Sequence, residues 1–346
     1  MSIASKCLGI ALITGAAATA AVARERVVRI GVLMPISGPA SYFGVQDKEG
    51  FDLALDQLGK APPINGYRLQ LQVEDSACSP LQATNAAKRV LEQFKPALVI
   101  GEECSDASLA IAPILEQAQV PLLNAGSVTM KLTESGYKYV FRIFPNAEQQ
   151  SLPLAKVAYQ TLKARTAVVL YEKTNAGNDN ADGFEKLFAG MGGKVLARID
   201  FGRDVNDFTA IATRIASLGR VDVLPWGFDQ KAGPPAEGYV RIVQFDPTEQ
   251  RPMVQNFVAA FRARYGADRT PSHINAHAYD AIMLAAEAVR RGATDAASMR
   301  DQLARMKDIE VTTGRISFDA KGQNSDLSVV HFVETQKDLS WRSLAW

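Results

Sequence analysis

The chain has 346 residues, and its 38 Lys and Arg residues nearly balance its 37 Asp and Glu residues. This balance, without any block of like charges, argues against a nucleic acid or an anionic membrane surface as partner, because both select basic patches. The length exceeds what one hydrophobic core normally spans, so two domains are expected. After the first residues, no apolar stretch reaches the roughly 20 residues that a membrane-spanning helix needs.

The first 23 residues have the pattern of a secretory signal peptide. Lys6 precedes the short apolar run Cys7–Ile13, and the small residues of Ala21-Val22-Ala23 come just before Arg24. The apolar run is too short to span a bilayer. We therefore expect cleavage near Ala23 and export of the mature chain to the periplasm.

Strands and helices alternate over the first half of the mature chain. Apolar runs predict strands, and periodic apolar positions predict helices. The expected elements are a strand at 27–33, a helix at 41–58 with Ser41 as N-cap, a turn at 64–67, a strand at 68–74, a helix at 80–94, a strand at 97–100, a helix from 105 to about 119, and strands at 120–123 and 139–143. Short loops between alternating elements indicate right-handed βαβ units and a parallel sheet.

A second alternation begins after Pro145. Its expected strands lie at 167–170, 194–200 and 221–224, and its expected helices at about 180–191 and 206–218. The segment Gly227–Glu237 interrupts the pattern, because it is too short and too rich in Gly and Pro for a parallel crossover. A strand at 239–245, helices at 252–265, 273–291 and 295–306, and strands at 314–318 and 327–334 follow. Two α/β lobes in tandem are therefore expected.

Cys78 and Cys104 remain after removal of the signal peptide, an even number in an oxidising compartment. Each follows a predicted strand, and neighbouring parallel strands bring their ends together. We expect a disulfide, and two buried thiols are the alternative. A metal site is disfavoured, since two cysteines without nearby histidines cannot complete a tetrahedral shell.

Sequence motifs of common enzymes are missing. The chain contains no Walker A, G-x-S-x-G or H-E-x-x-H pattern, and no nucleophile and base stand out together. No enzymatic activity, catalytic residue, metal or cofactor is therefore expected. His273 and His277 have the spacing of one helix face, but a third metal ligand is missing nearby and a packing role is favoured.

Two predicted strand-to-helix turns, Cys104–Ser108 and Asn124–Thr129, carry hydroxyls and small residues. In a doubly wound sheet such turns lie together at the carboxyl ends of the strands, where ligands bind. Free backbone N–H groups and the positive end of a helix dipole favour an anion there. The alternative is that Ser105 and Ser127 only cap their helices.

Segments along nearly the whole mature chain occur in the order of one known family: Ile30–Pro39, Val73–Pro80, Ile100–Ser108, Leu132–Tyr137 with Val140–Arg142, Asp207–Ala210, Ala236–Gly238 and Thr313–Asp319. The chain thus resembles the leucine/isoleucine/valine-binding protein family, the periplasmic type I solute-binding proteins of ABC importers. The resemblance implies two Rossmann-like lobes joined by three hinge strands, with the ligand in the cleft. It also implies a monomer whose closed form docks on the permease, which works with ATPase subunits.

By position in the family, the chain should cross between lobes near 141–145, 245–247 and 319–326. The expected limits are 24–143 plus 247–325 for lobe 1 and 144–246 plus 326–346 for lobe 2, which is shortened at 227–237. Carried over residue by residue, the lobe 1 ligand contacts of the family fall on Phe43, Ser105, Gly126 and Ser127. The family disulfide falls on Cys78 and Cys104.

Two departures from the family affect the expected site. Val128 stands where binders of α-amino acids usually carry Thr, and the adjacent Thr129 is the candidate substitute. In lobe 2, Ala176 stands where an aromatic residue is frequent, and Phe228 or Trp226 is expected to supply it.

The acid that normally pairs the ligand ammonium lies in the missing segment. A buried ammonium without a carboxylate costs several kcal/mol. Either another acid takes the role, the ligand is a small carboxylate without an amino group, or the shortened lobe binds poorly. The candidate acids are Asp229, Asp179, Glu103 and Asp106. The expected function is substrate binding for an ABC importer of branched-chain or related amino acids, and a ligand sensor that presents its closed form to a receptor is the alternative.

Overall fold

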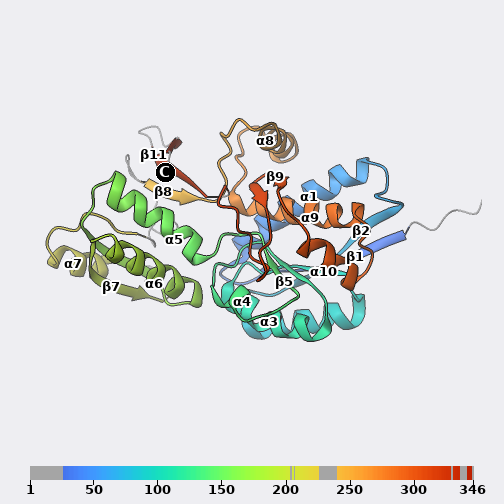
Figure 1. Cartoon of the computed structure of the whole chain (residues 1–346), viewed down its shortest axis with the longest axis horizontal. Coiled ribbons are helices and arrows are strands. Elements are labelled where there is room, and N and C mark those ends of the chain that lie inside the picture. The colour runs from blue at the N-terminus through green and yellow to red at the C-terminus, as the bar shows by residue number, and fades with distance from the viewer. Residues whose placement is uncertain are drawn as a thin grey trace, which may run out of the picture.

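Figure 1 shows the computed structural model of the chain, which describes residues 26–202, 205, 207–225, 240–328, 330–335 and 341–344. The signal peptide expected at 1–23 and the shortened segment expected at 227–237 lie outside the described residues. Two α/β lobes lie beside each other along the longest axis of the molecule (Figure 1).

The sheet of lobe 1 has five parallel strands. They are β1 (Arg26–Met34), β2 (Tyr67–Asp75), β3 (Leu98–Gly101), β4 (Leu122–Asn124) and β5 (Val140–Arg142). Their spatial order is β2-β1-β3-β4-β5. The strand order reverses between β1 and β3, and in doubly wound sheets ligands bind beyond the carboxyl ends of the strands at that point.

Helices cover both faces of this sheet. They are α1 (Ser41–Lys60), α2 (Pro80–Arg89) with the π-helical turn η1 (Val90–Phe94), α3 (Ser105–Ala118), α4 (Lys131–Glu134), α8 (Pro252–Tyr265), α9 (His273–Arg290) and α10 (Ala296–Ala304). Val32 and Ile100 point into the core with α1, α8 and α9, whereas Leu33 and Val99 point into the core with α2 and α3. Burial of both faces explains the apolar runs Ile30–Met34 in β1 and Leu98–Gly101 in β3. A hairpin of β9 (Ile309–Val311) and β10 (Gly314–Ile316) completes the lobe.

The described residues of lobe 2 form two separate small sheets. Its elements are α5 (Ala147–Lys156) with the π-helical turn η2 (Val157–Thr161), β6 (Thr166–Glu172), α6 (Asn175–Gly190), β7 (Lys194–Phe201), α7 (Thr209–Ser217), β8 (Val240–Val243), β11 (His331–Thr335) and β12 (Trp341–Leu344). β6 and β7 pair in parallel, whereas β12, β11 and β8 form an antiparallel sheet in that order. The chain therefore passes between the lobes after β5, after β8 and after β10.

Several predicted elements differ from the structure. The strand expected at 221–224 is reduced to one parallel bridge between Val223 and Ala167. Ser41 is the first residue of α1 and not its N-cap, which is Ala40 without a side-chain bond. The helix expected to start near 180 begins at Asn175, because the Thr174 hydroxyl accepts a hydrogen bond from the N–H of Gly177.

The helix α5 and the strands β9 and β12 are missing from the prediction. Asn146 caps α5 in a capping box, in which the Asn146 side chain accepts from the Gln149 N–H and the Gln149 side chain accepts from the Asn146 N–H. This spacing is a helix-start signal that follows Pro145 directly in the sequence.

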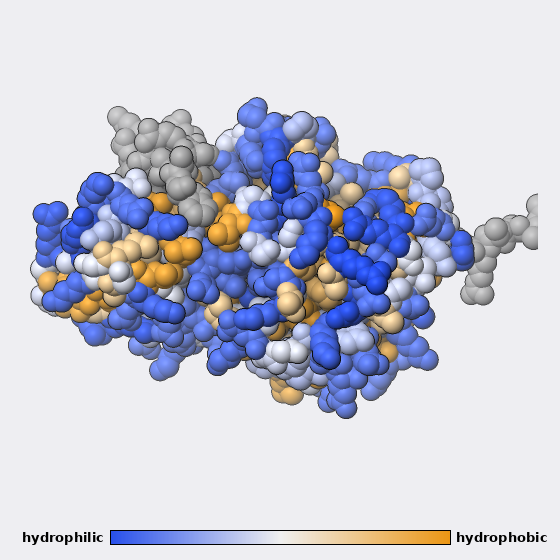
Figure 2. All heavy atoms as spheres, viewed as in Figure 1, coloured by the Kyte–Doolittle hydropathy of each residue, from blue (hydrophilic) through white to orange (hydrophobic). Residues whose placement is uncertain are grey.

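The face shown in Figure 2 is mostly hydrophilic, and its visible hydrophobic residues gather mainly on lobe 2 and near the middle of the molecule. Among the described residues, no helix combines the length and the hydropathy required to cross a membrane.

Candidate functional site

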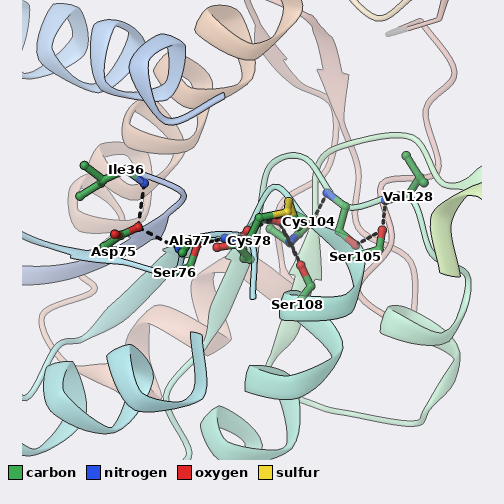
Figure 3. The surroundings of a disulfide bond; sticks show 12 residues. Ile36, Asp75, Ser76, Ala77, Cys78, Cys104, Ser105, Ser108 and Val128 are labelled. Atoms are coloured by element: carbon green, nitrogen blue, oxygen red, sulfur yellow. Dashed lines mark hydrogen bonds between the residues drawn. A yellow bond between two sulfur atoms is a disulfide. The ribbon is translucent and has the colours of Figure 1, made fainter. Parts of the chain in front are cut away.

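A disulfide joins two loops at the carboxyl edge of the lobe 1 sheet. Cys78 follows β2 and Cys104 follows β3, the two strands that flank β1, and the bond holds their Cα atoms 5.4 Å apart. Figure 3 shows the bond beside the start of α3. The predicted disulfide is confirmed, and it fixes the β3–α3 turn from one side.

Asp75 positions a third loop at the same edge, the one between β1 and α1. Its carboxylate accepts hydrogen bonds from the N–H groups of Ile36 (2.9 Å), Ser37 (3.2 Å) and Ala77 (2.8 Å), as Figure 3 shows for Ile36 and Ala77. The Ser37 hydroxyl donates to its other oxygen at 2.5 Å. The end of β2 therefore determines where α1 begins.

Ser105 and Ser127 meet across the two predicted turns. Ser127 Oγ donates to Ser105 Oγ at 3.1 Å, and the Val128 N–H donates to the same oxygen at 3.3 Å (Figure 3 shows the second bond). Neither serine is a helix cap. Cys104 is the N-cap of α3, without a side-chain bond, and α4 begins only at Lys131. The capping alternative is therefore wrong, and the second turn leads into a loop instead of directly into a helix.

Asn124 links the two turns from inside and is fully buried. Its Nδ2 group donates to the carbonyls of Gly101 (3.2 Å) and Glu102 (2.8 Å) and to Ser108 Oγ (3.1 Å). Its Oδ1 atom accepts from the Ser127 N–H at 2.9 Å. The nitrogen and the oxygen of the Asn124 side-chain amide thus hold the two turns in fixed positions relative to each other. The only signal for this role in the sequence is a polar residue at the end of a buried strand.

Three carboxyl groups, those of Asp47, Glu102 and Glu103, lie close to these turns. Asp47 of α1 and Glu102 are 3% and 0% exposed, whereas Glu103 keeps part of its surface exposed. Asp47 and Glu103 share a side-chain hydrogen bond. A Cβ atom on Gly126 would collide with the Glu103 carboxyl group, so glycine is required while Glu103 occupies this place.

Burial dominates the electrostatics of this acidic group. It raises the pKa of Glu102 to about 7. Burial and the nearby charge of Glu102 raise the pKa of Glu103 to about 8. Burial and the charges of Glu103 and Glu102 also raise the pKa of Asp47 well above its ordinary value. Of the three acids, Glu103 alone is among the site candidates that the sequence predicts.

Arg142 lies behind the second turn and is fully buried. Its guanidinium donates to the carbonyls of Ser127 (3.2 Å) and Thr129 (2.6 Å), to Thr133 Oγ1 (3.0 Å) and to Gln323 Oε1 (2.6 Å). Burial lowers the pKa of Arg142 to about 9. All four partners are neutral oxygens, and three of them belong to residues 127–133. Arg142 therefore fixes the shape of this loop.

The aromatic candidates are only partly described. Phe43 is partly buried against the core of α2 and α3, and its ring centroid lies 4.0 Å from that of Tyr42. Phe228 and Trp226 lie outside the described residues, and so does Asp229. Ala176 is half-buried in α6.

Lobe 2 contacts the second turn through α6. Asp179 accepts hydrogen bonds from Thr129 Oγ1 at 2.6 Å and from the Met130 N–H at 3.0 Å. Nearby, Asn175 Nδ2 donates to Asp106 Oδ1 of α3. The Thr129 hydroxyl and two of the candidate acids, Asp179 and Asp106, are therefore bonded across the lobes in this arrangement.

The two spaced histidines pack inside lobe 1. His277 is 1% exposed, its Nδ1 atom lies 2.8 Å from the His273 carbonyl, and its ring centroid lies 4.8 Å from that of Phe144. Burial lowers the pKa of His277 to about 3. In the part of the chain that the structure describes, no group of three His, Cys, Asp or Glu side chains could hold a metal ion.

A two-lobed α/β protein with polar turns at the strand-order reversal of one lobe, facing a helix of the other, belongs to the class of two-lobed ligand-binding proteins. The sequence pattern of the periplasmic binding protein family matches residues 27–224 and 223–335. The chain belongs to this family, whose members bind solutes and are not enzymes.

Relatives with described functions agree with this assignment. The chain is 25% identical over 337 residues to the leucine-, isoleucine-, valine-, threonine-, and alanine-binding protein of Pseudomonas aeruginosa, which covers 87% of this chain and 89% of that protein. It is 30% identical over 207 residues to an amino acid binding protein of the same organism, but that match spans only 55% of the relative's length and 60% of this chain.

Solved structures show the same fold. A leucine binding protein from Thermotoga maritima superposes with a TM-score of 0.81 and 25% identity, covering 92% of this chain and 98% of that one. A solute binding protein from Rhodopseudomonas palustris BisB5 in complex with 3,4-dihydroxybenzoic acid superposes with a TM-score of 0.80 and 21% identity, covering 92% and 96%. The predicted type I periplasmic binding protein fold is confirmed.

Proposed function

We propose that this protein is the extracytoplasmic substrate-binding subunit of an ABC importer for branched-chain or related amino acids. One observation carries the proposal: the polar turn after β4, which lies beside the turn after β3 at the β1/β3 reversal of lobe 1, meets α6 of lobe 2 through the Thr129–Asp179 hydrogen bond. A ligand between these walls contacts both lobes only when they are shut, so binding favours the closed state by its differential affinity. The names of the relatives support amino acids as the ligand class.

The proposal includes the details that the sequence predicts. Residues 1–23 are the signal peptide, cleaved near Ala23, and the mature chain works in the periplasm as a monomer with permease and ATPase subunits. The lobes comprise 24–143 plus 247–325 and 144–246 plus 326–346. The proposed ligand contacts are Phe43, Ser105, Gly126, Ser127, Thr129 and Phe228.

For Thr129 this role requires that the ligand replace Asp179 as the acceptor of its hydroxyl. For Ser105 and Ser127 it requires that the ligand join a hydroxyl pair that is already hydrogen bonded. Phe43 and Gly126 keep exposed surface and need no such exchange.

A second candidate is a binder of a small carboxylate without an amino group. Val128 favours it, because the hydroxyl that usually receives the carboxylate of an α-amino acid is missing at this position. A sensor that presents the closed form to a receptor would use the same site, and only the partner protein distinguishes it from an importer subunit.

A ligand screen tests the proposal. The purified mature chain is titrated with branched-chain amino acids, their 2-keto acids, aromatic amino acids and simple aliphatic and aromatic carboxylates. We expect a branched-chain amino acid to raise the melting temperature, since a ligand that binds only the folded state stabilises it. We also expect small-angle X-ray scattering to show a smaller radius of gyration with ligand. A higher melting temperature with carboxylates alone would favour the binder of a small carboxylate. An unchanged melting temperature with every compound would contradict both candidate functions.

A further inference from the structure

Thr129 and Met130 direct their hydrogen-bond donors to the other lobe, unlike the residues just before them. The Ser127 hydroxyl and the N–H groups of Ser127 and Val128 bond within lobe 1. The Thr129 hydroxyl and the Met130 N–H both donate to one oxygen of lobe 2, Asp179 Oδ2, at 2.6 and 3.0 Å. Two donors of adjacent residues thus converge on a single carboxylate oxygen.

The buried cation Arg142 lies next to these donors. Its Nη1 atom donates to the Thr129 carbonyl at 2.6 Å, and in the part of the chain that the structure describes its guanidinium hydrogen bonds to no carboxylate. Burial lowers the pKa of Arg142 to about 9, and the negative charges of Asp179, Glu134 and Asp319 counteract this. A buried charge without an ion-pair partner is costly, so the position of the Asp179 carboxylate favours an anion.

Asp179 is therefore held in the way that a protein holds the carboxylate of a small ligand. A hydroxyl, a backbone N–H and a nearby cation all stabilise negative charge at one point. The group that fills this point is not part of lobe 1. Asp179 is half-buried and lies on α6 of lobe 2, so it leaves the donors of lobe 1 when the lobes separate.

We propose that Asp179 is a built-in competitor of the ligand: its carboxylate occupies an anion position at Thr129 and Met130, and a ligand carboxylate must displace it to bind. This inference rests on the proposed function and concerns the regulation of the same site. The bonds to Asp179 stabilise only the closed state without ligand, because the liganded state has exchanged them for bonds to the ligand. They therefore lower the affinity for the ligand. Repulsion between the two carboxylates lowers it further.

Substitution of Asp179 distinguishes a competitor from a merely structural link. L-leucine and 4-methylpentanoic acid share a carboxylate and a hydrocarbon chain, so they serve as probes for the two candidate ligand classes. By isothermal titration calorimetry, we expect Asp179→Ala to bind the probe that wild type prefers about 10-fold more tightly, the lower end of the range for a hydrogen bond to a charged group. A link that only supports the liganded closed state predicts weaker binding instead. Asp182→Ala, on the same helix and paired with Arg198, is the matched control and should leave the affinity unchanged.

A double-mutant cycle tests whether Asp179 and the ligand compete for the same donor. Thr129→Val removes the hydroxyl and keeps the shape of this fully buried side chain. If the competition takes place at Thr129, Asp179→Ala should raise the affinity much less in the Thr129→Val chain than in wild type. The remaining gain reports the Met130 N–H, which the substitution leaves in place.

The outcomes separate this inference from the proposed function. If a probe binds wild type and Asp179→Ala binds it equally or less tightly, the inference is wrong and the proposed function stands. An equal gain with and without the Thr129 hydroxyl also contradicts the inference. If neither probe binds wild type or Asp179→Ala, the inference is wrong and the wider ligand screen decides the proposed function. Binding by Asp179→Ala alone would support the inference. Should Asp179→Ala fail to fold, Asp179→Asn replaces it, since it removes the charge, keeps the shape and should raise the affinity in the same direction.

Discussion

The Thr129 hydroxyl donates a 2.6 Å hydrogen bond to the Asp179 carboxylate, and this bond joins the polar turn of lobe 1 to α6 of lobe 2. The Met130 N–H donates to the same Asp179 oxygen at 3.0 Å. Asn175 and Asp106 form a second link, between α6 and α3 of lobe 1. The two lobes are therefore held together by groups of the protein itself, beside the place where a ligand is proposed to bind.

Removal of this link should favour the open state. In Asp179→Ala, Thr129 and Met130 lose a half-buried charged acceptor, and a hydrogen bond to a charged group contributes about 1.5–3 kcal/mol. We expect a larger radius of gyration by small-angle X-ray scattering without ligand, because the closed state loses the bonds that favour it. Asp182→Ala, on the same helix but paired with Arg198, is the control. Equal radii for the Asp179 variant and wild type would show that the link does not hold the lobes.

The disulfide should contribute strongly to the stability of the mature chain. The bond between Cys78 and Cys104 closes a loop with a sequence separation of 26 residues. Loop-closure entropy for this length predicts a loss of about 3–4 kcal/mol in unfolding free energy for the double serine variant, measured by urea denaturation. Wild type treated with a reductant serves as a comparison without mutation. An unchanged urea midpoint in both samples would contradict the prediction.

Glu102 should make the chain less stable at alkaline pH. Its pKa is raised by burial to about 7, so the folded state holds a proton that the unfolded state releases at lower pH. The stability that Glu102 contributes is therefore present below about pH 4.5 and is lost as pH rises through 7. We expect Glu102→Gln to be about 2–3 kcal/mol more stable than wild type at pH 8, and nearly equal to it at pH 4.5.

Urea unfolding of both proteins at these two pH values checks the prediction. The same difference at pH 4.5 and at pH 8 would mean that the titration of Glu102 is not its cause. Glu148→Gln, in the first turn of α5 and exposed, should show no comparable gain at pH 8.

Arg142 should be difficult to replace. Its guanidinium donates to four neutral oxygens from two parts of the chain, the loop at 127–133 and Gln323, and a lysine ammonium cannot reproduce this planar arrangement. We expect Arg142→Lys to lower the unfolding free energy by about 3 kcal/mol, because several buried acceptors lose their donors. The exposed Arg220→Lys is the matched control and should change it by less than about 0.5 kcal/mol. A fully stable Arg142→Lys chain would contradict the role assigned to this network.

The sequence predicts much of lobe 1 because its signals are local. β3 and the second half of β1, Ile30–Met34, are apolar runs whose two faces are both covered by helices, and this burial pattern leaves a clear trace in the residues. The turn at 64–67 is equally local, since Asn65 and Gly66 both have positive φ angles of 51° and 80°. The disulfide is predicted from two cysteines that each follow a strand; the strands are expected to be neighbours, but β1 lies between them.

Other features depend on partners that local patterns do not reveal. Ser105 looks like a helix cap in the sequence, but its hydroxyl is used by Ser127, 22 positions away. Arg142 sits in a short apolar strand, and its partner Gln323 lies 181 positions later. Glu103 is one of several acids in the sequence, and only the position of Gly126 shows that its carboxyl group reaches the proposed site.

The way the chain passes between its lobes has a consequence for folding. Arg142, just before the first passage, forms a parallel bridge with Gln323, and β8 of lobe 2 pairs with β11, where Val243 faces His331. Each lobe is thus completed by residues from the last part of the chain, so neither can finish folding while that part is still being synthesised or exported. Such distant contacts slow folding. The polypeptide should therefore stay unfolded until almost all of it has been delivered, and then assemble both lobes together.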